Sequence, residues 1–336
     1  MNKFTDLPKS QQIKYFDRLA LEYNLSTVAI EKDWWITAVL RALFSLSYAE
    51  NLSFKGGTSL SKCYNLIERF SEDIDIAVNR KFLGYGGVLS KTQISDGLRR
   101  AACSFVRAKL QFDVAQQMEN QGIGKDLFSV QVNITPVSTT DPEIVEICYK
   151  SLFPRNNYLK PIVKLEVSGR SMSEPLSKIT LQSFVDETYS NNSFANLPFE
   201  VNAVMPERTF LEKVCLLHEE FAKPQEFTRT ERMSRHLYDW AKMYDAGIAE
   251  KALADKDLFG NIVEHRRIFI GLKDFDYNTL NPATINIIPP ENVIAVWQRD
   301  YETMRETMIY GESLSFGKLI DKIKQLNERI NQLEPE

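Results

Sequence analysis

Several residue types are scarce in this sequence, and each scarcity narrows what the protein can be. Only four cysteines occur in 336 residues, and none forms a Cys-x-x-Cys pair. This excludes a zinc or disulfide framework of the usual spacing and favours reduced core cysteines, as in cytoplasmic proteins. With only three histidines (His218, His236 and His265), a metal site built on histidine is not expected.

Long hydrophobic runs are also missing. No apolar stretch reaches the ~18–20 residues that a membrane-spanning helix needs, and the best candidate, 34–49, is interrupted by Arg41. The N-terminal residues lack the apolar core of a signal peptide, so we expect a cytoplasmic protein that contacts no membrane. An excess of basic residues is absent too. The net charge of −4 argues against a large nonspecific nucleic-acid surface.

The composition that remains is that of an ordinary globular protein, with 43% hydrophobic and 26% charged residues. We predict an N-terminal domain with leading helices over 1–204 and a helical C-terminal domain over 205–336. Periodicity predicts helices over 7–23, 26–46, 58–68, 92–112, 206–221, 230–246, 291–309 and 319–333. It predicts strands over 51–55, 73–78, 128–134, 143–149, 162–167, 179–184 and 199–204.

A short charged stretch, Glu31-Lys32-Asp33-Trp34-Trp35, falls inside the second predicted helix. We interpret it as part of an amphipathic helix. Its charged outer edge is expected to face water while the tryptophans pack on the core. We assign this stretch no chemistry.

The stretch with the clearest chemistry begins with Gly56-Gly57-Thr58-Ser59, between a predicted strand and a predicted helix. Two glycines permit positive φ angles and let a ligand approach the main chain closely. Thr58 or Ser59 is expected to cap the helix, whose free N–H groups and dipole favour an anion. The pattern therefore indicates a phosphate-binding turn.

Two aspartates follow in Ser71-Glu72-Asp73-Ile74-Asp75. On a strand, Asp73 and Asp75 point to one face, and their Cα atoms lie roughly 6.6 Å apart. Such a pair can bind one hard cation such as Mg²⁺ together with phosphate oxygens. A phosphate cradle beside a divalent-metal pair is typical of nucleotidyl or phosphoryl transfer. The simpler interpretation is a glycine turn followed by a solvated acidic strand end.

Gly-Gly-Thr, then a helix, then Ser-x-Asp-hydrophobic-Asp resembles the polymerase β-type nucleotidyltransferase superfamily. More narrowly, it resembles the AbiEii/MenT family, the toxins of type IV toxin–antitoxin systems. Further segments similar to this family are 31–35, Arg208-Thr209-Phe210-Leu211-Glu212-Lys213 and Arg235-His236-Leu237-Tyr238-Asp239. The resemblance implies an α+β fold, in which a polymerase β-type core (a mixed sheet flanked by helices) is followed by a helical C-terminal part.

The resemblance also implies roles for individual residues. Asp73 and Asp75 would bind Mg²⁺ or Mn²⁺, and Glu166, on a further strand, would complete a two-metal arrangement or act as a base. Lys213 would steady the triphosphate, and Asp239 would orient this lysine or an arginine. The residues expected to bind the nucleotide are Gly56, Gly57, Thr58, Ser59, Lys62, Ser71 and Arg235.

For some of these residues an ordinary structural role is also open. Glu166 would then form a surface pair with Lys164 on an antiparallel strand. Lys213 would be a solvated lysine on an amphipathic helix. Arg235 and Asp239 would form a surface pair four residues apart.

By the same resemblance, we expect a growth-inhibiting toxin of an abortive-infection (phage defence) system, paired with an antitoxin encoded beside it. The enzyme would transfer NMP from an NTP to an RNA acceptor, the 3′ end of tRNA, and release pyrophosphate. Two other classes stay open. One is the same chemistry on a protein hydroxyl or a small molecule, and the other is a catalytically silent nucleotide-binding module.

Ser71 is expected to share a strand face with Asp73 and Asp75. Phosphorylation of Ser71 would place about −1.5 to −2 charges beside the metal site. We therefore expect that modification to silence the enzyme.

Overall fold

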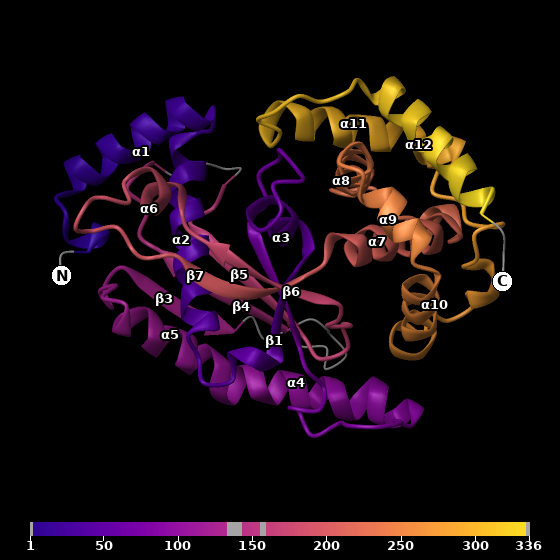
Figure 1. Ribbon diagram of the computed structural model, residues 1–336, viewed down its shortest axis with the longest axis horizontal. Helices are drawn as coiled ribbons and strands as arrows, with labels where there is room; N and C mark the ends of the chain where they lie inside the picture. Colours follow the sequence, from indigo (N-terminus) through magenta and orange to yellow (C-terminus); the bar gives the residue numbers. More distant parts are fainter. Residues whose placement is uncertain (1–2, 133–142, 155–158, 334–336) are drawn as a thin grey trace. The chain divides into compact units, whose positions relative to one another are not determined.

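The computed structural model of the chain describes residues 3–132, 143–154 and 159–333 (Figure 1). The chain divides into two compact units. The first comprises Met1–Cys63 and Ser71–Val204, and the second comprises Tyr64–Phe70 and Met205–Glu336. The chain therefore leaves the first unit just before the acidic strand and then returns to it.

The first unit is built on a mixed β-sheet. Its described strands are β1 (Leu52–Lys55), β2 (Asp73–Val78), β3 (Phe128–Val132), β4 (Glu143–Tyr149), β5 (Ile162–Ser168), β6 (Leu176–Leu181) and β7 (Phe199–Val204). Their order across the sheet is β3-β4-β5-β2-β1-β7-β6. β2 runs parallel to β5 and antiparallel to β1, while β1 runs parallel to β7. The acidic strand β2 is therefore central, with a neighbour on each side.

Apolar side chains alternate with polar ones along the central strands. Ile74 and Ile76 on β2 and Leu165 and Val167 on β5 have no exposed surface. The strand register pairs Ile74 with Leu165 and Ile76 with Val167, so these four side chains share one face. Burying each of them contributes about 1.5–3 kcal/mol, and this fixes which face of the sheet turns toward the core.

Helices pack around this sheet (Figure 1). They are η1 (Phe4–Asp6), α1 (Lys9–Tyr23), α2 (Thr27–Phe44), η2 (Ala49–Asn51), α3 (Gly56–Lys62), η3 (Gln93–Leu98), α4 (Arg99–Phe105), η4 (Val106–Leu110), α5 (Gln111–Asn120) and α6 (Phe184–Thr188). α2 packs against β5, β7, α1 and α5, and α3 packs against β1 and β2. The Ser26 side chain accepts a hydrogen bond from the Ala29 N–H and so caps α2.

The second unit is helical over its described residues. Its helices are α7 (Pro206–Phe221), η5 (Gln225–Phe227), α8 (Ser234–Asp245), α9 (Ile248–Ala254), α10 (Lys256–His265), η6 (Arg266–Ile270), η7 (Tyr277–Thr279), α11 (Glu291–Thr307) and α12 (Phe316–Asn331). Phe210 on α7 stacks on Trp240 of α8, with ring centroids 5.0 Å apart. The segment Tyr64–Phe70 joins this unit, because the Phe70 N–H donates to the Met308 carbonyl at 2.8 Å.

The predicted α+β fold with a mixed sheet flanked by helices is confirmed. Helices α1, α2 and α7 and strands β1, β2, β4, β5 and β7 form within a residue or two of the predicted ranges. Residues 133 and 134 of the predicted strand 128–134 lie outside the described residues. Within the described ranges, no helix is long and apolar enough to cross a membrane.

Several predicted boundaries are wrong. The predicted helix 92–112 continues through α5 to Asn120, and the predicted helix 319–333 is α12, Phe316–Asn331. The predicted helix 58–68 is α3, which begins at Gly56 and ends at Lys62, because the next segment joins the second unit. The predicted strand 179–184 forms instead as Leu176–Leu181, since Ser183 caps α6 by accepting from the Asp186 N–H. The predicted helix 230–246 begins only at Ser234, after Arg232 adopts a left-handed φ of 57°.

The interpretation of the charged stretch at 31–35 is also wrong. Glu31, Lys32 and Asp33 do not face water, since they are 1%, 1% and 5% exposed. Apolar residues flank the stretch on both sides in the sequence, at 28–30 and 34–36. On each side, three successive apolar residues point in different directions around α2, so the helix has no polar face next to the stretch. That surrounding apolarity is the signal that would have predicted burial.

Candidate active site

The two aspartates lie at the beginning of β2, which starts at Asp73. Asp73 and Asp75 are half-buried and alternate with the fully buried Ile74 and Ile76. Because side chains alternate along a strand, both carboxylates lie on the face opposite the isoleucines. The local sequence pattern is sufficient to produce this arrangement.

The neighbouring strands add three charged residues to the same face. β5 places Glu166 opposite Asp75 and Lys164 opposite Asp73, and β1 places Lys55 opposite Asp75. Residues opposite each other in register point to the same side of a sheet. Asp73, Asp75 and Glu166 therefore form one acidic surface on two adjacent strands, flanked by two lysines. β5 pairs antiparallel with β4 on its other edge, so Glu166 lies inside the sheet, not at its margin.

The glycine turn directly adjoins this acidic surface. Gly56 follows β1, begins α3 and has a φ of +81°. A Cβ atom at Gly56 would lie 1.9 Å from Oδ2 of Asp75, so only glycine fits against this carboxylate. The first backbone N–H groups of a helix have no partner within it. The start of α3 thus brings donor groups to the edge of the carboxylate cluster.

The hydroxyls of Thr58 and Ser59 lie inside the protein. Thr58 is 1% exposed and Ser59 is 2% exposed. The Thr58 hydroxyl donates to the carbonyl oxygen of Asp73 and lies 2.9 Å from the hydroxyl of Ser71. Neither residue caps α3, whose N-cap position is Lys55. Thr58 therefore ties α3 to the start of β2, and the groups placed to meet a phosphate are the backbone N–H groups.

Lys62 ends α3, and its ammonium group pairs with the carboxylate of Asp33 on α2. The side chain is 11% exposed and also lies over the Phe184 ring, 5.6 Å from its centroid. A second buried lysine on α2, Lys32, pairs with Glu72, the residue before Asp73. The sequence analysis assigned no role to Lys32, Asp33 or Glu72.

The predicted residues Lys213 and Asp239 come together in the second unit. Lys213 Nζ on α7 lies 3.0 Å from Oδ2 of Asp239 on α8 and 3.1 Å from Nδ1 of His236. Arg69 binds the same carboxylate in bidentate fashion, with Nε at 2.6 Å from Oδ1 and Nη2 at 2.8 Å from Oδ2. Asp239 has no exposed surface. The sequence analysis missed Arg69, which lies 170 residues from its partner.

Burial and charge act in opposite directions on this cluster. Burial would raise the pKa of Asp239, but Arg69 and Lys213 outweigh it and hold the pKa below its usual value. Burial, together with the positive charges of Lys213 and Arg235, lowers the pKa of His236 well below its usual value. Neutral His236 can accept a hydrogen bond from the Lys213 ammonium group through Nδ1. Burial lowers the pKa of Lys213 below its usual value, and the charge of Asp239 opposes this shift. Two basic side chains, Arg69 and Lys213, thus meet on one buried carboxylate.

A carboxylate from a different helix fixes the start of α8. Asp300 on α11 accepts from the Arg232 N–H at 2.6 Å and from the Ser234 N–H at 2.9 Å. These bonds satisfy N–H groups that the helix leaves open. Arg235 is half-buried in the first turn beyond this cap. The position of Asp239, one turn further along, thus depends on Asp300.

No group of three or more His, Cys, Asp or Glu side chains among the described residues is arranged to hold a metal ion by itself. A cation at the acidic surface would therefore complete its oxygen shell with water or substrate phosphate. This is how Mg²⁺ binds at many nucleotide sites, where one or two carboxylates suffice.

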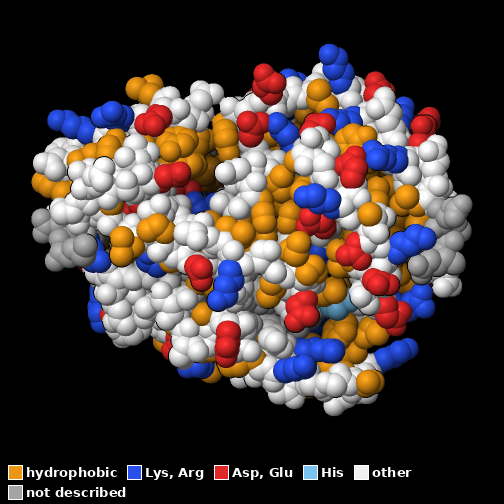
Figure 2. Space-filling view, in the orientation of Figure 1, with side chains coloured by type: hydrophobic (Ala, Val, Ile, Leu, Met, Phe, Trp, Pro, Cys, Tyr) orange, Lys and Arg blue, Asp and Glu red, His pale blue; other side chains and the backbone are white. Residues whose placement is uncertain are grey.

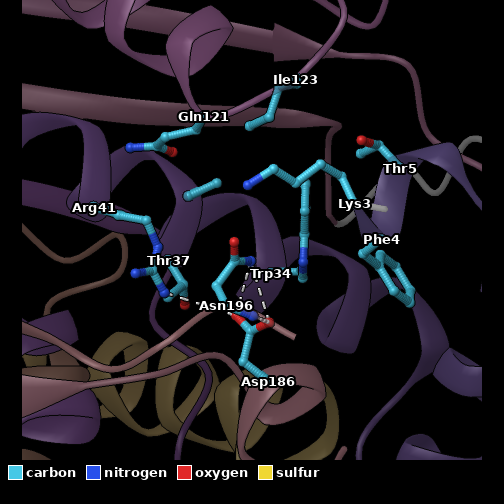
Figure 3. Close-up of a pocket in the computed structure, with 11 residues that line it drawn as sticks. Lys3, Phe4, Thr5, Trp34, Thr37, Arg41, Gln121, Ile123, Asp186 and Asn196 are labelled. Atoms are coloured by element: carbon cyan, nitrogen blue, oxygen red, sulfur yellow. Dashed lines mark hydrogen bonds and ion pairs between the residues drawn. The ribbon is translucent and has the colours of Figure 1, made fainter. Parts of the chain in front are cut away.

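Two other cavities do not involve the predicted residues of the acidic surface. Figure 3 shows a polar pocket of about 20 Å³ in the first unit, lined partly by Arg41, Gln121 and Asp186. That volume accommodates little more than a water molecule. A larger cavity of about 420 Å³ in the second unit is lined mainly by apolar side chains such as Leu211 and Phe259. Its apolar walls do not suit a triphosphate.

Comparison with known proteins identifies the family. Residues 38–324 match the family described as nucleotidyl transferase AbiEii toxin, type IV toxin–antitoxin system. No curated protein matches the chain. Similar solved structures include MenT4, a nucleotidyltransferase toxin from Mycobacterium tuberculosis H37Rv, with 16% identity, coverage of 98% of this chain and 91% of that chain, and a TM-score of 0.49. Another is JHP933 from Helicobacter pylori, with 14% identity, coverage of 92% and 94%, and a TM-score of 0.44.

We draw nothing on function from these two distant structures. The family match is different in kind, because it extends over most of the chain and includes β2, α7 and α8. The chain belongs to the AbiEii family of nucleotidyltransferase toxins of type IV toxin–antitoxin systems.

Proposed function

We propose that this toxin transfers NMP from an NTP to a hydroxyl of an RNA acceptor, the 3′ end of tRNA, and releases pyrophosphate. The observation that carries the proposal is the shared sheet face of Asp73, Asp75 and Glu166 beside the Gly56 turn. Carboxylates next to helix N-terminal N–H groups can bind a cation and a polyphosphate together. NTP chemistry requires both.

Asp73 and Asp75 would hold the divalent cation, Mg²⁺ or Mn²⁺, with Glu166 beside it. The donor set fits, because such hard cations take carboxylate and phosphate oxygens. When bound, the ion would neutralise charge on the triphosphate.

The chain's own groups would do the remaining work. Backbone N–H groups at the start of α3 would donate to phosphate oxygens, since Gly56 and Gly57 leave the main chain uncovered. Glu166 would accept the proton of the attacking acceptor hydroxyl. The hydroxyl oxygen would form a bond to the α-phosphorus as the bond from that phosphorus to the bridging oxygen breaks, and pyrophosphate leaves.

Lys213 and Arg235 would supply positive charge to the phosphates. Support comes from the two basic side chains that meet on Asp239, Arg69 and Lys213, and from the family motifs that contain Lys213 and Arg235. Asp239 would keep the Lys213 ammonium group in one position. Because lysine acts as a point charge, its placement must come from such a partner.

The acceptor class rests on the family to which the chain belongs. On the face shown in Figure 2, basic and acidic side chains are interspersed among the described residues. A small structured end of an RNA would therefore suit the protein better than a long duplex, which binds broad basic surfaces. As a type IV toxin, the protein would have an antitoxin encoded beside it.

The test is incubation of the purified protein with each α-³²P-labelled NTP, Mg²⁺ and either total tRNA or a tRNA-free protein extract. We expect label on tRNA, loss of labelling in Asp73→Asn and Asp75→Asn, and normal labelling in the control Glu200→Gln, an exposed carboxylate on β7. Unchanged labelling in Asp73→Asn would overturn the site. Label on protein instead of tRNA would overturn the acceptor.

A further inference from the structure

Three consecutive charged residues of α2 are buried, and the last two of them contact the segments that form the candidate site. Lys32 and Asp33 on α2 are 1% and 5% exposed. Each buried charge carries a desolvation cost of several kcal/mol unless a partner offsets it. Both residues have such partners, and those partners lie in the two segments that form the candidate site.

Lys32 reaches the acidic strand. Its ammonium group pairs with Glu72, the residue immediately before Asp73, and also donates to the carbonyl of Lys160 at 3.1 Å. The Glu72 side chain is 15% exposed. Lys32 therefore fixes the entry to β2 and neutralises a carboxylate that is adjacent in sequence to a proposed metal ligand.

Asp33 reaches the glycine-turn helix. One carboxylate oxygen pairs with Lys62, the last residue of α3, and the other accepts from the Phe184 N–H at 3.1 Å. α3 is only two turns long, and its other end is Gly56. Holding Lys62 therefore sets the position of the N–H groups that start the helix.

A third contact joins α3 directly to the acidic strand. The Thr58 hydroxyl on α3 donates to the carbonyl of Asp73, so the two segments are also tied to each other. One rigid helix thus holds the acidic strand and the glycine turn through two neighbouring side chains. Both helices, α2 and α3, belong to the first unit (Figure 1).

Stability alone does not account for these two ion pairs. Replacing a buried ion pair with apolar residues of similar volume is often neutral or stabilising. In some proteins, buried charges are retained because they specify one geometry among several. Here the specified geometry is that of the carboxylates and the turn.

We propose that Lys32 and Asp33 are positioning residues of the nucleotidyl-transfer site, Lys32 acting through Glu72 on the acidic strand and Asp33 acting through Lys62 on the glycine turn. The inference rests on the proposed function above. It gives Lys62 the role of an anchor for α3, in place of the direct phosphate contact expected from the sequence.

The two residues should differ in kinetic effect. Lys32→Met removes the ion pair that holds Glu72 at the entry to the acidic strand, so we expect at least a tenfold lower kcat and weaker Mn²⁺ binding by EPR. Asp33→Asn keeps an acceptor for the Phe184 N–H but loses the charge that holds Lys62. We expect at least a tenfold higher KM for NTP with a smaller change in kcat.

The matched control is the buried pair Glu219–Arg266, which belongs to the second unit. Arg266→Met should lower Tm as Lys32→Met does, yet leave kcat, KM and Mn²⁺ binding within twofold of wild type. If Lys32→Met does not fold, the double variant Lys32→Met with Glu72→Gln removes both charges. It therefore tests the same ion pair between α2 and the acidic strand. We expect this double variant to fold and to keep the tenfold loss of kcat.

The outcomes separate this inference from the proposed function. If wild type labels no acceptor and Asp73→Asn behaves like it, the proposed function fails. If wild type is active, Asp73→Asn is inactive, and Lys32→Met and Asp33→Asn match Arg266→Met in kcat and KM, the positioning role fails. Equal effects of both variants on kcat and KM would also overturn it, since a general loss of stability would produce that pattern.

Discussion

The backbone of Gly56 lies against the carboxylate of Asp75, with room for no side chain between them. Gly56→Ala would place a methyl group 1.9 Å from Asp75 Oδ2, at a φ of +81° that alanine rarely adopts. We expect transfer to fall by about 100-fold, as misplacing a reacting group by ~1 Å does. The measurement is NMP transfer to tRNA.

Gly87→Ala is the control for this prediction. Gly87 has a φ of +74° with no atom within 4 Å of the added Cβ, so the substitution carries the backbone strain without the overlap. Its Tm should drop while transfer is kept. Equal transfer by both variants would show that the contact with Asp75 is unimportant.

A negative charge at Ser71 should inhibit the enzyme. Ser71 is half-buried next to Thr58 and two residues before Asp73. Ser71→Glu adds a charge beside the metal ligands, so labelling of tRNA should fall sharply, whereas Ser71→Ala should stay active. Ser190→Glu, an exposed position in the same unit, controls for the added charge. Full activity of Ser71→Glu would contradict the prediction.

Asp239 should contribute a distinctive pH dependence to stability. Its pKa in the folded protein is below its usual value, so it releases its proton more readily when folded. The stabilisation is therefore fully present above the unfolded pKa of about 3.9 and is lost as the pH falls toward the folded pKa. Urea unfolding between pH 3 and 7 should show this slope.

Asp239→Asn should lack that acid-dependent contribution. It should also be less stable at pH 7 by about 3–5 kcal/mol, because Arg69 and Lys213 would lose the buried carboxylate that they share. An unchanged slope below pH 4 in Asp239→Asn would show that other carboxyl groups cause the loss.

The bidentate bond from Arg69 should not tolerate lysine. Arg69→Lys keeps the charge but cannot donate through both Nε and Nη2 to Asp239. We expect a loss of about 1.5–3 kcal/mol, the size of one hydrogen bond to a charged group. Arg299→Lys, at an exposed position on α11, should be neutral in the same urea titration.

The cysteines should differ in reactivity. Burial raises the pKa of Cys63 and of Cys215 to about 12, so almost no thiolate is present at pH 8. The pKa values of Cys103 and Cys148 are raised by a smaller amount, and both side chains are partly exposed, as is that of Cys63. Iodoacetamide at pH 8, followed by mass spectrometry, should label Cys103 and Cys148 first. Urea should equalise all four.

Local patterns predicted the parts of the site that are close in sequence. Strict alternation placed Asp73 and Asp75 on one face of β2, and the glycines marked the turn at the start of α3. Glu166 was identified as the third acid, but its place opposite Asp75 depends on strand pairing across the sheet. Periodicity within a strand carries no information on that register.

The long-range ion pairs could not be predicted in the same way. A lysine on a helix is normally solvated, so nothing local in Lys32 indicates Glu72, 40 residues away. The pair between Arg69 and Asp239 could not be predicted either, because the sequence around Arg69 is typical of the end of a helix in the first unit. Such pairs become visible only when the fold brings distant segments together.

The excursion of Tyr64–Phe70 into the second unit has a consequence for synthesis on the ribosome. Arg69 emerges 170 residues before Asp239, which at 5–20 residues per second is roughly 10–30 s. During that time Asp239 has not yet been synthesised, and Met308, the partner of the Phe70 N–H, follows later still. The segment Tyr64–Phe70 therefore cannot make these native contacts until α8 and α11 have been translated.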